Sequence, residues 1–311
     1  MPKLHKENGN LYLQAGTKHR TVAVLGEVLW DLFDHSRRLG GAPLNFAAHA
    51  ARLGHSALLM SAVGNDSLGE EAAEAIQAIG LTTAFLQRTS RFPTGAARVH
   101  LGPGDQTHFV IERPAAYDAV CISDRDLEQL IPHSPVWLYY GSLFASTASG
   151  ECALCRLSNA FPAATRFYDL NLRPDCWYPA LVTRLMRNAD VVKLNEEELA
   201  CVQEFTGLPR STEAFCREGA DRYGWNAVCV TLGARGCAVL AHGDYVESEG
   251  HVVDVADTVG AGDAFAAAFM HGLVSEWPVT EIAAFANRVG ALVASRKGAI
   301  PAWTLEEAVA L

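Results

Sequence analysis

Short, nearly uninterrupted hydrophobic runs alternate with amphipathic segments from about residue 21 onward. Residues 22–25 predict a strand buried on both faces, residues 44–53 a helix that ends at Gly54, and residues 57–63 the next strand. The helical period returns over residues 67–79. Both helices end beside a glycine, which suits the left-handed cap conformation.

Further strands, separated by helical segments, are predicted at residues 136–140, 166–170, 190–194 and 227–232. Strand, helix and strand in succession predict an α/β fold with a mostly parallel sheet covered by helices on both faces. A chain of 311 residues can bury a sizeable core, and we expect residues 1–311 to form one domain.

Residues 95–111 break this rhythm. Apolar and polar positions alternate there on both sides of a Gly-Pro-Gly-Asp turn at residues 102–105, as in a β-hairpin. Such a hairpin is either a surface ornament or a lid that closes over a crevice at the strand ends, and the pattern alone favours neither. We expect lid segments near residues 31–41 and 95–113.

Composition excludes some classes of function. The chain has 35 acidic and 25 basic residues, a formal net charge of −10, and no concentrated basic stretch, which argues against a nucleic-acid partner. No apolar run approaches the roughly 20 residues that span a bilayer, and the N-terminal residues lack the apolar core of a signal peptide. We therefore expect a cytoplasmic protein without a membrane partner.

The eight cysteines are predicted to be buried thiols, because many lie in apolar runs. Cys152 and Cys155 have the spacing of a zinc or redox pair. They have no second pair beside them and fall in a helix-like stretch, so the structural interpretation is preferred.

The most informative segment is Gly260-Ala261-Gly262-Asp263, where a loop runs into a helix. The glycines leave backbone N–H groups accessible, and the helix N-terminus adds partial positive charge, so the segment can hold a phosphate. Asp263 in the first turn could accept the proton of an attacking hydroxyl. The alternative is a tight turn followed by an acid that favours the helix start. Phe265 replaces the third glycine of a dinucleotide-binding fingerprint.

The string from Asp257 to Phe265, Asp-Thr-Val-Gly-Ala-Gly-Asp-Ala-Phe, resembles the C-terminal signature of the ribokinase-like (PfkB) carbohydrate kinases. The resemblance extends from Gly26 to Pro301. It implies a three-layer αβα ribokinase-like fold with a small β-hairpin lid, and ATP and Mg²⁺ as cofactors. It also implies that Asp263 is the catalytic base and that the amides of the preceding loop, at Gly260, Ala261 and Gly262, form an anion hole.

Three further segments resemble sugar-binding parts of the family. They are the Gly-Gly-Ala-Pro-Leu-Asn segment from residue 40, the Gly-Glu-Val-Leu-Trp-Asp string from residue 26, and the Asp-Leu-Asn-Leu-Arg string from residue 169. The last two look most like bacterial fructokinases. The resemblance implies that substrate is bound by Asp31, Gly40, Gly41, Asn45, Asn171 and Arg173, and we add Arg98 of the lid. A proline-led helix start and a surface salt bridge of Arg173 are the alternatives.

The prediction of the ATP-binding residues also depends on the resemblance. It implies ATP binding by Asn195, Thr231, Gly233, Gly236, Gly262 and Asn287. Asn195 and Glu198 match an Asn-x-x-Glu motif in which Glu198 holds Mg²⁺ through water. The alternative for this motif is an ordinary helix cap. Asp257 and Val259 correspond to a potassium site of many relatives.

These observations predict transfer of the ATP γ-phosphate to the primary hydroxyl of a sugar, with D-fructose as first choice. Leu44 and Leu170 depart from the commonest family forms near the sugar and leave 2-keto-3-deoxygluconate, ribose or a nucleoside open. A keto acid needs a cation, which Arg98, Arg113 or Arg173 could supply. A non-catalytic sugar or nucleotide sensor is the alternative from another class. A dehydrogenase ranks last, because the turn after Leu25 lacks the glycine spacing.

We also expect a homodimer. The exposed strands of a lid have unpaired edges, and pairing them across a two-fold axis would satisfy those edges.

Overall fold

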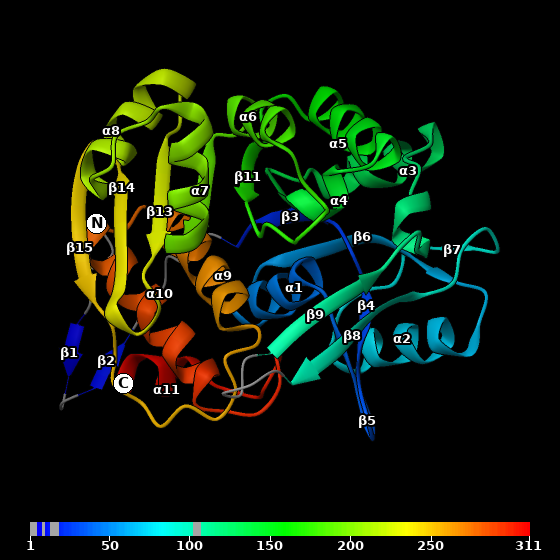
Figure 1. Cartoon of the computed structure of the whole chain (residues 1–311). Coiled ribbons are helices and arrows are strands. Elements are labelled where there is room, and N and C mark those ends of the chain that lie inside the picture. The colour runs from blue at the N-terminus through cyan, green and yellow to red at the C-terminus, as the bar shows by residue number, and fades with distance from the viewer. Residues whose placement is uncertain (1–4, 8–9, 13–18, 102–106) are drawn as a thin grey trace.

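The computed structural model describes residues 5–7, 10–12, 19–101 and 107–311 (Figure 1). The predicted turn at residues 102–105 lies outside these ranges. At the N-terminal end, β1 (His5–Glu7) pairs antiparallel with β2 (Asn10–Tyr12).

A nine-stranded sheet forms the centre of the molecule. Its order is β15 (Asp244–Glu249), β14 (Gly236–Ala241), β13 (Ala227–Thr231), β12 (Val191–Asn195), β11 (Thr165–Asp169), β10 (Trp137–Gly141), β3 (Thr21–Leu25), β6 (Ser56–Gly64) and β7 (Leu86–Thr89). All pairings from β13 to β7 are parallel, and β14 and β15 add antiparallel to β13. The mostly parallel sheet predicted from the sequence is confirmed.

Helices cover both faces of this sheet, as Figure 1 shows. Val22 and Val24 face a core that is covered by α1 (Ala42–Arg52), α2 (Ser67–Ala78), α9 (Ala261–Val274), α10 (Val279–Ala294) and α11 (Leu305–Ala310). Ala23 and Leu25 face the opposite core. That face carries α3 (Asp124–Leu130), α4 (Ser142–Ala145), α5 (Ala148–Ala160), α6 (Pro179–Arg187), α7 (Glu196–Thr206), α8 (Thr212–Tyr223) and the 3₁₀ turns η1 (Ala116–Ala119) and η2 (Ile131–His133). The predicted three-layer αβα architecture is confirmed.

A second sheet of four strands projects from the first at the side of β6 and β7 (Figure 1). Its order is β5 (Ser36–Gly40), β4 (Leu29–Phe33), β8 (Gly95–Leu101) and β9 (Thr107–Glu112). Strands β8 and β9 form the hairpin that the alternation predicts, and β4 pairs with β8 in parallel. The sheet thereby joins the two segments near residues 31–41 and 95–113.

Two ion pairs hold β5 against the body of the molecule. Arg37 pairs with Glu71 of α2 at 2.5 Å, and Arg38 pairs with Asp257, in the loop before α9, at 2.8 Å. The edge of the four-stranded sheet is therefore connected to the loop that leads into the Gly-Ala-Gly-Asp segment.

The cysteines differ from the prediction. Cys216, Cys229 and Cys237 are buried, but Cys121, Cys152 and Cys155 are exposed. The last two lie in α5, as expected, but on the part of the helix that faces solvent. An apolar run in a helix has two faces, and the run alone does not say which residues pack inward.

Within the described ranges, the structure contains no helix long and apolar enough to cross a membrane. No cluster of His, Cys, Asp and Glu among these residues could hold a metal by itself.

Candidate active site

A cavity of about 360 Å³ lies at the carboxyl ends of the parallel strands and is closed on one side by the four-stranded sheet. Ligands of open α/β sheets usually bind at this edge. The predicted residues that line it are Asp31, Gly41, Asn45, Asn171, Arg173, Asn195, Glu198, Thr231, Val259, Gly260, Gly262 and Asp263. Residues from both ends of the chain thus meet in one place.

The Gly-Ala-Gly-Asp segment begins α9. Gly260 is the N-cap with φ of 81°, and a Cβ there would lie 2.5 Å from the backbone oxygen of Ala299. The conformation and the close approach both require glycine. Ala261 donates its N–H to Thr258 at 3.3 Å, whereas the N–H groups of Gly262 and Asp263 have no acceptor among the described residues. The start of α9 therefore presents two open donors to an anion.

Asp263 lines the cavity and is partly buried. Its Oδ2 accepts a hydrogen bond from Asn45 Nδ2 at 2.8 Å, which links the start of α9 to α1. Burial raises the pKa of Asp263 to about 6, and the neighbouring carboxylate of Asp169 adds to this effect. Asn45, Lys193 and Arg173 favour the charged form. A carboxylate with this pKa is ionised at neutral pH and basic enough to take a proton.

Polar groups suited to a polyol surround Asp263. Asn45 Oδ1 is buried without a hydrogen-bond partner among the described residues, so it can accept from a hydroxyl. Glu27 and Asp31 also line the cavity, and burial raises their pKa values to about 7 and about 6. Glu27 was not among the predicted site residues, although it precedes the predicted Asp31 by only four positions.

The predicted paired glycines have separate roles. A Cβ on Gly41, where φ is 115°, would lie 2.4 Å from the carbonyl oxygen of Glu27. A Cβ on Gly40 would lie 2.9 Å from Asp31 Oδ2. Gly41 lines the cavity and Gly40 does not. The pair therefore lets β5 and α1 approach the two acidic residues.

A buried ion pair, which the sequence analysis missed, lies near Gly262 at the start of α9. Lys193 Nζ donates to Asp169 Oδ1 at 2.8 Å and to Oδ2 at 3.1 Å. Tyr139 Oη donates to the same carboxylate at 2.9 Å. Lys193 and Asp169 both line the cavity. A lone lysine inside an otherwise apolar predicted strand was the available signal, since a buried charge needs a partner.

The Asn-x-x-Glu motif is a capping box at the start of α7. Asn195 Oδ1 accepts from the Glu198 N–H at 2.8 Å, and Glu198 Oε2 accepts from the Asn195 N–H at 2.9 Å. Glu198 Oε1 accepts from the Leu172 N–H at 2.8 Å. Both side chains also line the cavity. Mg²⁺ keeps several of its waters, so contact through water with the Glu198 carboxylate at the cavity wall suits the predicted metal.

Not every predicted substrate residue reaches the cavity. Arg98 is exposed and pairs with Glu112 at 2.6 Å, because Ala97 takes the cavity-facing position on β8. Asn171, with φ of 46°, and Arg173 both line the cavity. Asparagine is one of the few residues that adopt this left-handed conformation readily.

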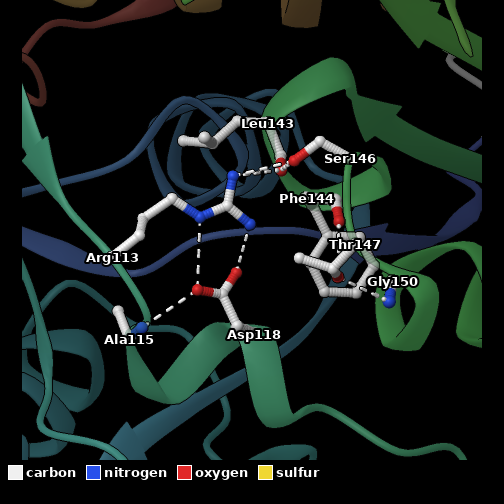
Figure 2. Close-up of polar contacts among 8 residues, drawn as sticks. All are labelled: Arg113, Ala115, Asp118, Leu143, Phe144, Ser146, Thr147 and Gly150. Carbon is white, nitrogen blue, oxygen red and sulfur yellow. Dashed lines mark hydrogen bonds and ion pairs between the residues drawn. The ribbon is translucent and has the colours of Figure 1, made fainter. Parts of the chain in front are cut away.

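Arg113 is also outside the cavity, and Figure 2 shows why. Its guanidinium pairs with Asp118 and donates to Ser146 Oγ at 2.8 Å and to the Leu143 carbonyl at 3.4 Å. Asp118 also accepts from the Ala115 N–H at 2.9 Å. Arg113 therefore joins the end of β9 to α4, whose Leu143 lines the cavity.

Some of the residues predicted to bind ATP line the cavity, and others do not. Thr231 lines the cavity at the end of β13. Gly233 begins η3 (Gly233–Arg235), and Gly236 follows with φ of 105° and a backbone so close to Ser248 that a Cβ would clash. Asn287 of α10 donates from Nδ2 to the Ser248 carbonyl at 3.2 Å. Gly233, Gly236 and Asn287 lie outside the cavity lining and shape the β14–β15 region behind it.

At the candidate potassium site, the Asp257 carboxylate accepts from Arg38, from the Val259 N–H at 3.1 Å and from the Gly298 N–H at 3.1 Å. These donors already stabilise its charge, so a monovalent ion there stays a prediction that rests on carbonyl oxygens.

Comparison with known proteins finds relatives that match most of this chain. A fructokinase of Escherichia coli is 31% identical over 300 residues, which are 90% of this chain and 95% of that protein. A fructokinase of Xylella fastidiosa solved with bound ATP gives a TM-score of 0.79 at 23% identity and covers 93% of this chain and 97% of that one. A 2-dehydro-3-deoxygluconokinase of Thermotoga maritima gives 0.81 at 23% identity, with coverage of 93% and 98%.

The two structures share the fold of this chain. The model of pfkB family carbohydrate kinases matches residues 18–305, which include the cavity residues of the four-stranded sheet, β12 and α9. The chain belongs to the pfkB family and is an ATP-dependent carbohydrate kinase.

Proposed function

We propose that this kinase transfers the γ-phosphate of ATP to the primary hydroxyl of D-fructose and forms fructose 6-phosphate. The observation that carries the proposal is the partly buried Asp263 carboxylate, which lines the same cavity as the start of α9 and the polar groups of Glu27, Asp31 and Asn45. The Escherichia coli relative that is 31% identical is a fructokinase, which supports the same substrate.

In this proposal each group at the start of α9 has its own role in phosphoryl transfer. Asp263 takes the proton of the attacking hydroxyl as its oxygen bonds to phosphorus. The open N–H groups of Gly262 and Asp263 hold the oxygens of the transferring group. Mg²⁺ bound near Glu198 would neutralise charge on the nucleotide phosphates.

The charge around the sugar favours a neutral acceptor. Of the three arginines that could bind a keto-acid carboxylate, Arg98 and Arg113 lie outside the cavity in ion pairs with Glu112 and Asp118. Glu27 and Asp31 lie in the cavity, and the ionised fraction of each would repel a carboxylate. A neutral polyol can instead accept and donate hydrogen bonds with both acids.

The four-stranded sheet acts as a lid. Leu29, Ala97 and Ile111 supply an apolar lining on its cavity side. Closing this surface over the sugar would exclude water, whose attack on ATP competes with transfer to the sugar.

A second candidate acceptor is 2-keto-3-deoxygluconate. It is favoured by Arg173, which does line the cavity, and by the fold shared with the Thermotoga enzyme. The same assay distinguishes it from fructose.

The test is ADP formation from Mg·ATP with fructose, 2-keto-3-deoxygluconate, ribose and nucleosides, for the parent, Asp263→Asn and Asp254→Asn. Asp254 is an exposed residue of the loop before α9, so its change controls for the loss of one charge. We expect turnover to be highest with fructose, to fall by about 100-fold or more in Asp263→Asn and to persist in Asp254→Asn. Preference for another acceptor overturns the fructose assignment, and unimpaired turnover in Asp263→Asn overturns the base.

A further inference from the structure

Lys193 is the cation of β12 that faces the anion site. Its side chain is about 8% exposed, and it lines the cavity together with Gly262 and Asp263. The Lys193 Nζ atom lies 3.8 Å from the point that a Cβ on Gly262 would occupy. No side chain stands between the ammonium group and the loop that holds phosphate.

The Lys193 ammonium group has more N–H donors than recorded acceptors among the described residues. It carries three N–H bonds, and its recorded partners among the described residues are the two oxygens of Asp169. The third N–H is available to a ligand of the cavity. Asp169 is itself fixed by Tyr139, whose ring stacks on Phe46 of α1 with 3.7 Å between ring centroids.

The charge of Lys193 is retained despite burial. Desolvation lowers the pKa of a buried lysine, but the Asp169 carboxylate more than offsets this and the net pKa lies above the usual value. Glu198 and Asp263 act in the same direction. A permanent cation is therefore held at the point where α9 directs its open N–H groups.

A buried ion pair that only balances charge would be the simpler interpretation. Such a pair costs desolvation energy and often contributes little to stability. It would need neither a place in the cavity wall nor a glycine opposite it. Both features are explained if an anion enters between Lys193 and Gly262.

We propose that Lys193 is a catalytic residue that donates a hydrogen bond to a non-bridging oxygen of the transferring phosphoryl group, and that Asp169 is the positioning residue that aims it. The acceptor oxygen bonds to phosphorus while the bond from phosphorus to the leaving oxygen of ADP breaks. Asp263 receives the hydroxyl proton, and Lys193 keeps its own protons throughout. Its charge offsets the negative charge on the equatorial oxygens.

The test compares Lys193→Met with Tyr139→Phe, which removes a hydrogen bond to Asp169 but leaves the ammonium group in place. Steady-state turnover is measured with the best acceptor. Binding of ADP and of ADP with aluminium fluoride, a mimic of the transferring group, is measured by calorimetry. The binding assay needs no acceptor, so it stands even if fructose is not the substrate.

We expect Lys193→Met to lose kcat and aluminium fluoride complex affinity by on the order of 100-fold or more, with ADP affinity changed by less than about three-fold. Tyr139→Phe should retain kcat within about ten-fold. Equal losses of affinity for ADP and for its aluminium fluoride complex, or an unchanged kcat, overturn the proposal. If Lys193→Met does not fold, the double variant Lys193→Met, Asp169→Asn removes both charges. It is judged by the same two comparisons with the parent, namely kcat and the affinity for the aluminium fluoride complex relative to that for ADP.

Discussion

Asp263 lies in surroundings that oppose its own ionisation. It is partly buried, it is near Asp169, and loss of solvation is the main reason why its pKa is raised to about 6. Above that pH the charged form is held against a desolvation cost, which is absent when the carboxyl is protonated. The fold tolerates this cost because the same burial makes the carboxylate a better base.

The pH dependence of turnover follows from this pKa. A base must be ionised to act, so kcat/KM should fall as pH drops below about 6 and level off above it, with a slope of about one on a logarithmic plot. Glu27 titrates nearby, with a pKa raised to about 7, so the profile is measured in Glu27→Gln as well. The acid limb should persist in that variant. A parent profile that is flat from pH 5 to about 8 would contradict the role of Asp263.

Sequence reasoning at this scale found the residues of short, distinctive strings. Asp263, Asn45 and Asp31 all line the cavity as predicted. Asp169 belongs to a quoted string, but Lys193 and its ion pair with Asp169 were missed, because the pairing joins two neighbouring strands and no local string records it. Arg98 was placed in the site although the alternation that identified its strand gives it the face opposite to Ala97.

Among the elements, the strands and helices with strong periodicity could be predicted to within one or two residues. The helix of residues 44–53 is observed as Ala42–Arg52, and the strand of residues 57–63 as Ser56–Gly64. The parallel pairing of β4 with β8 was not predictable, because it depends on contacts between segments far apart in the chain. Residue patterns state which side of a strand is apolar but not which strand lies beside it.

Alternation on β9 gives a matched test of the lid. Ile111 lines the cavity, whereas its neighbour Val110 points to solvent and is 54% exposed. Ile111→Ala should raise the KM for the sugar by about ten-fold, since apolar contact in the closed lid is lost. Val110→Ala should leave it unchanged. Steady-state kinetics on both variants decide, and equal effects would show that β9 does not close over the sugar.

At the scale of the whole molecule, a chain with a net charge of −10 binds a polyanion. The repulsion expected from this net charge is offset locally, because Lys193, Arg173 and the start of α9 all line the cavity. Net charge argued against a duplex-binding surface but could not locate these few groups.

Oligomeric state is predicted from the four-stranded sheet. Strands β5 and β9 each have one partner in this sheet, so each presents an edge to solvent. We expect a dimer in which such edges meet, with twice the mass of the chain in light scattering at micromolar concentration. Val110→Lys adds a charge on β9 and should shift the protein toward monomer. A parent that is monomeric at every concentration tested would refute the dimer.

The ion pair between Arg38 and Asp257 also bears on how the proposed lid would open. Its arginine is about half exposed, and a pair in that setting contributes at most about 1 kcal/mol. A contact of that size favours the closed population by no more than about five-fold over the open one. The balance between the two populations is therefore left to the ligands. In the proposed lid motion, a ligand bound beside the four-stranded sheet or beside α9 would bias both segments, since Arg38 connects β5 to the loop before α9.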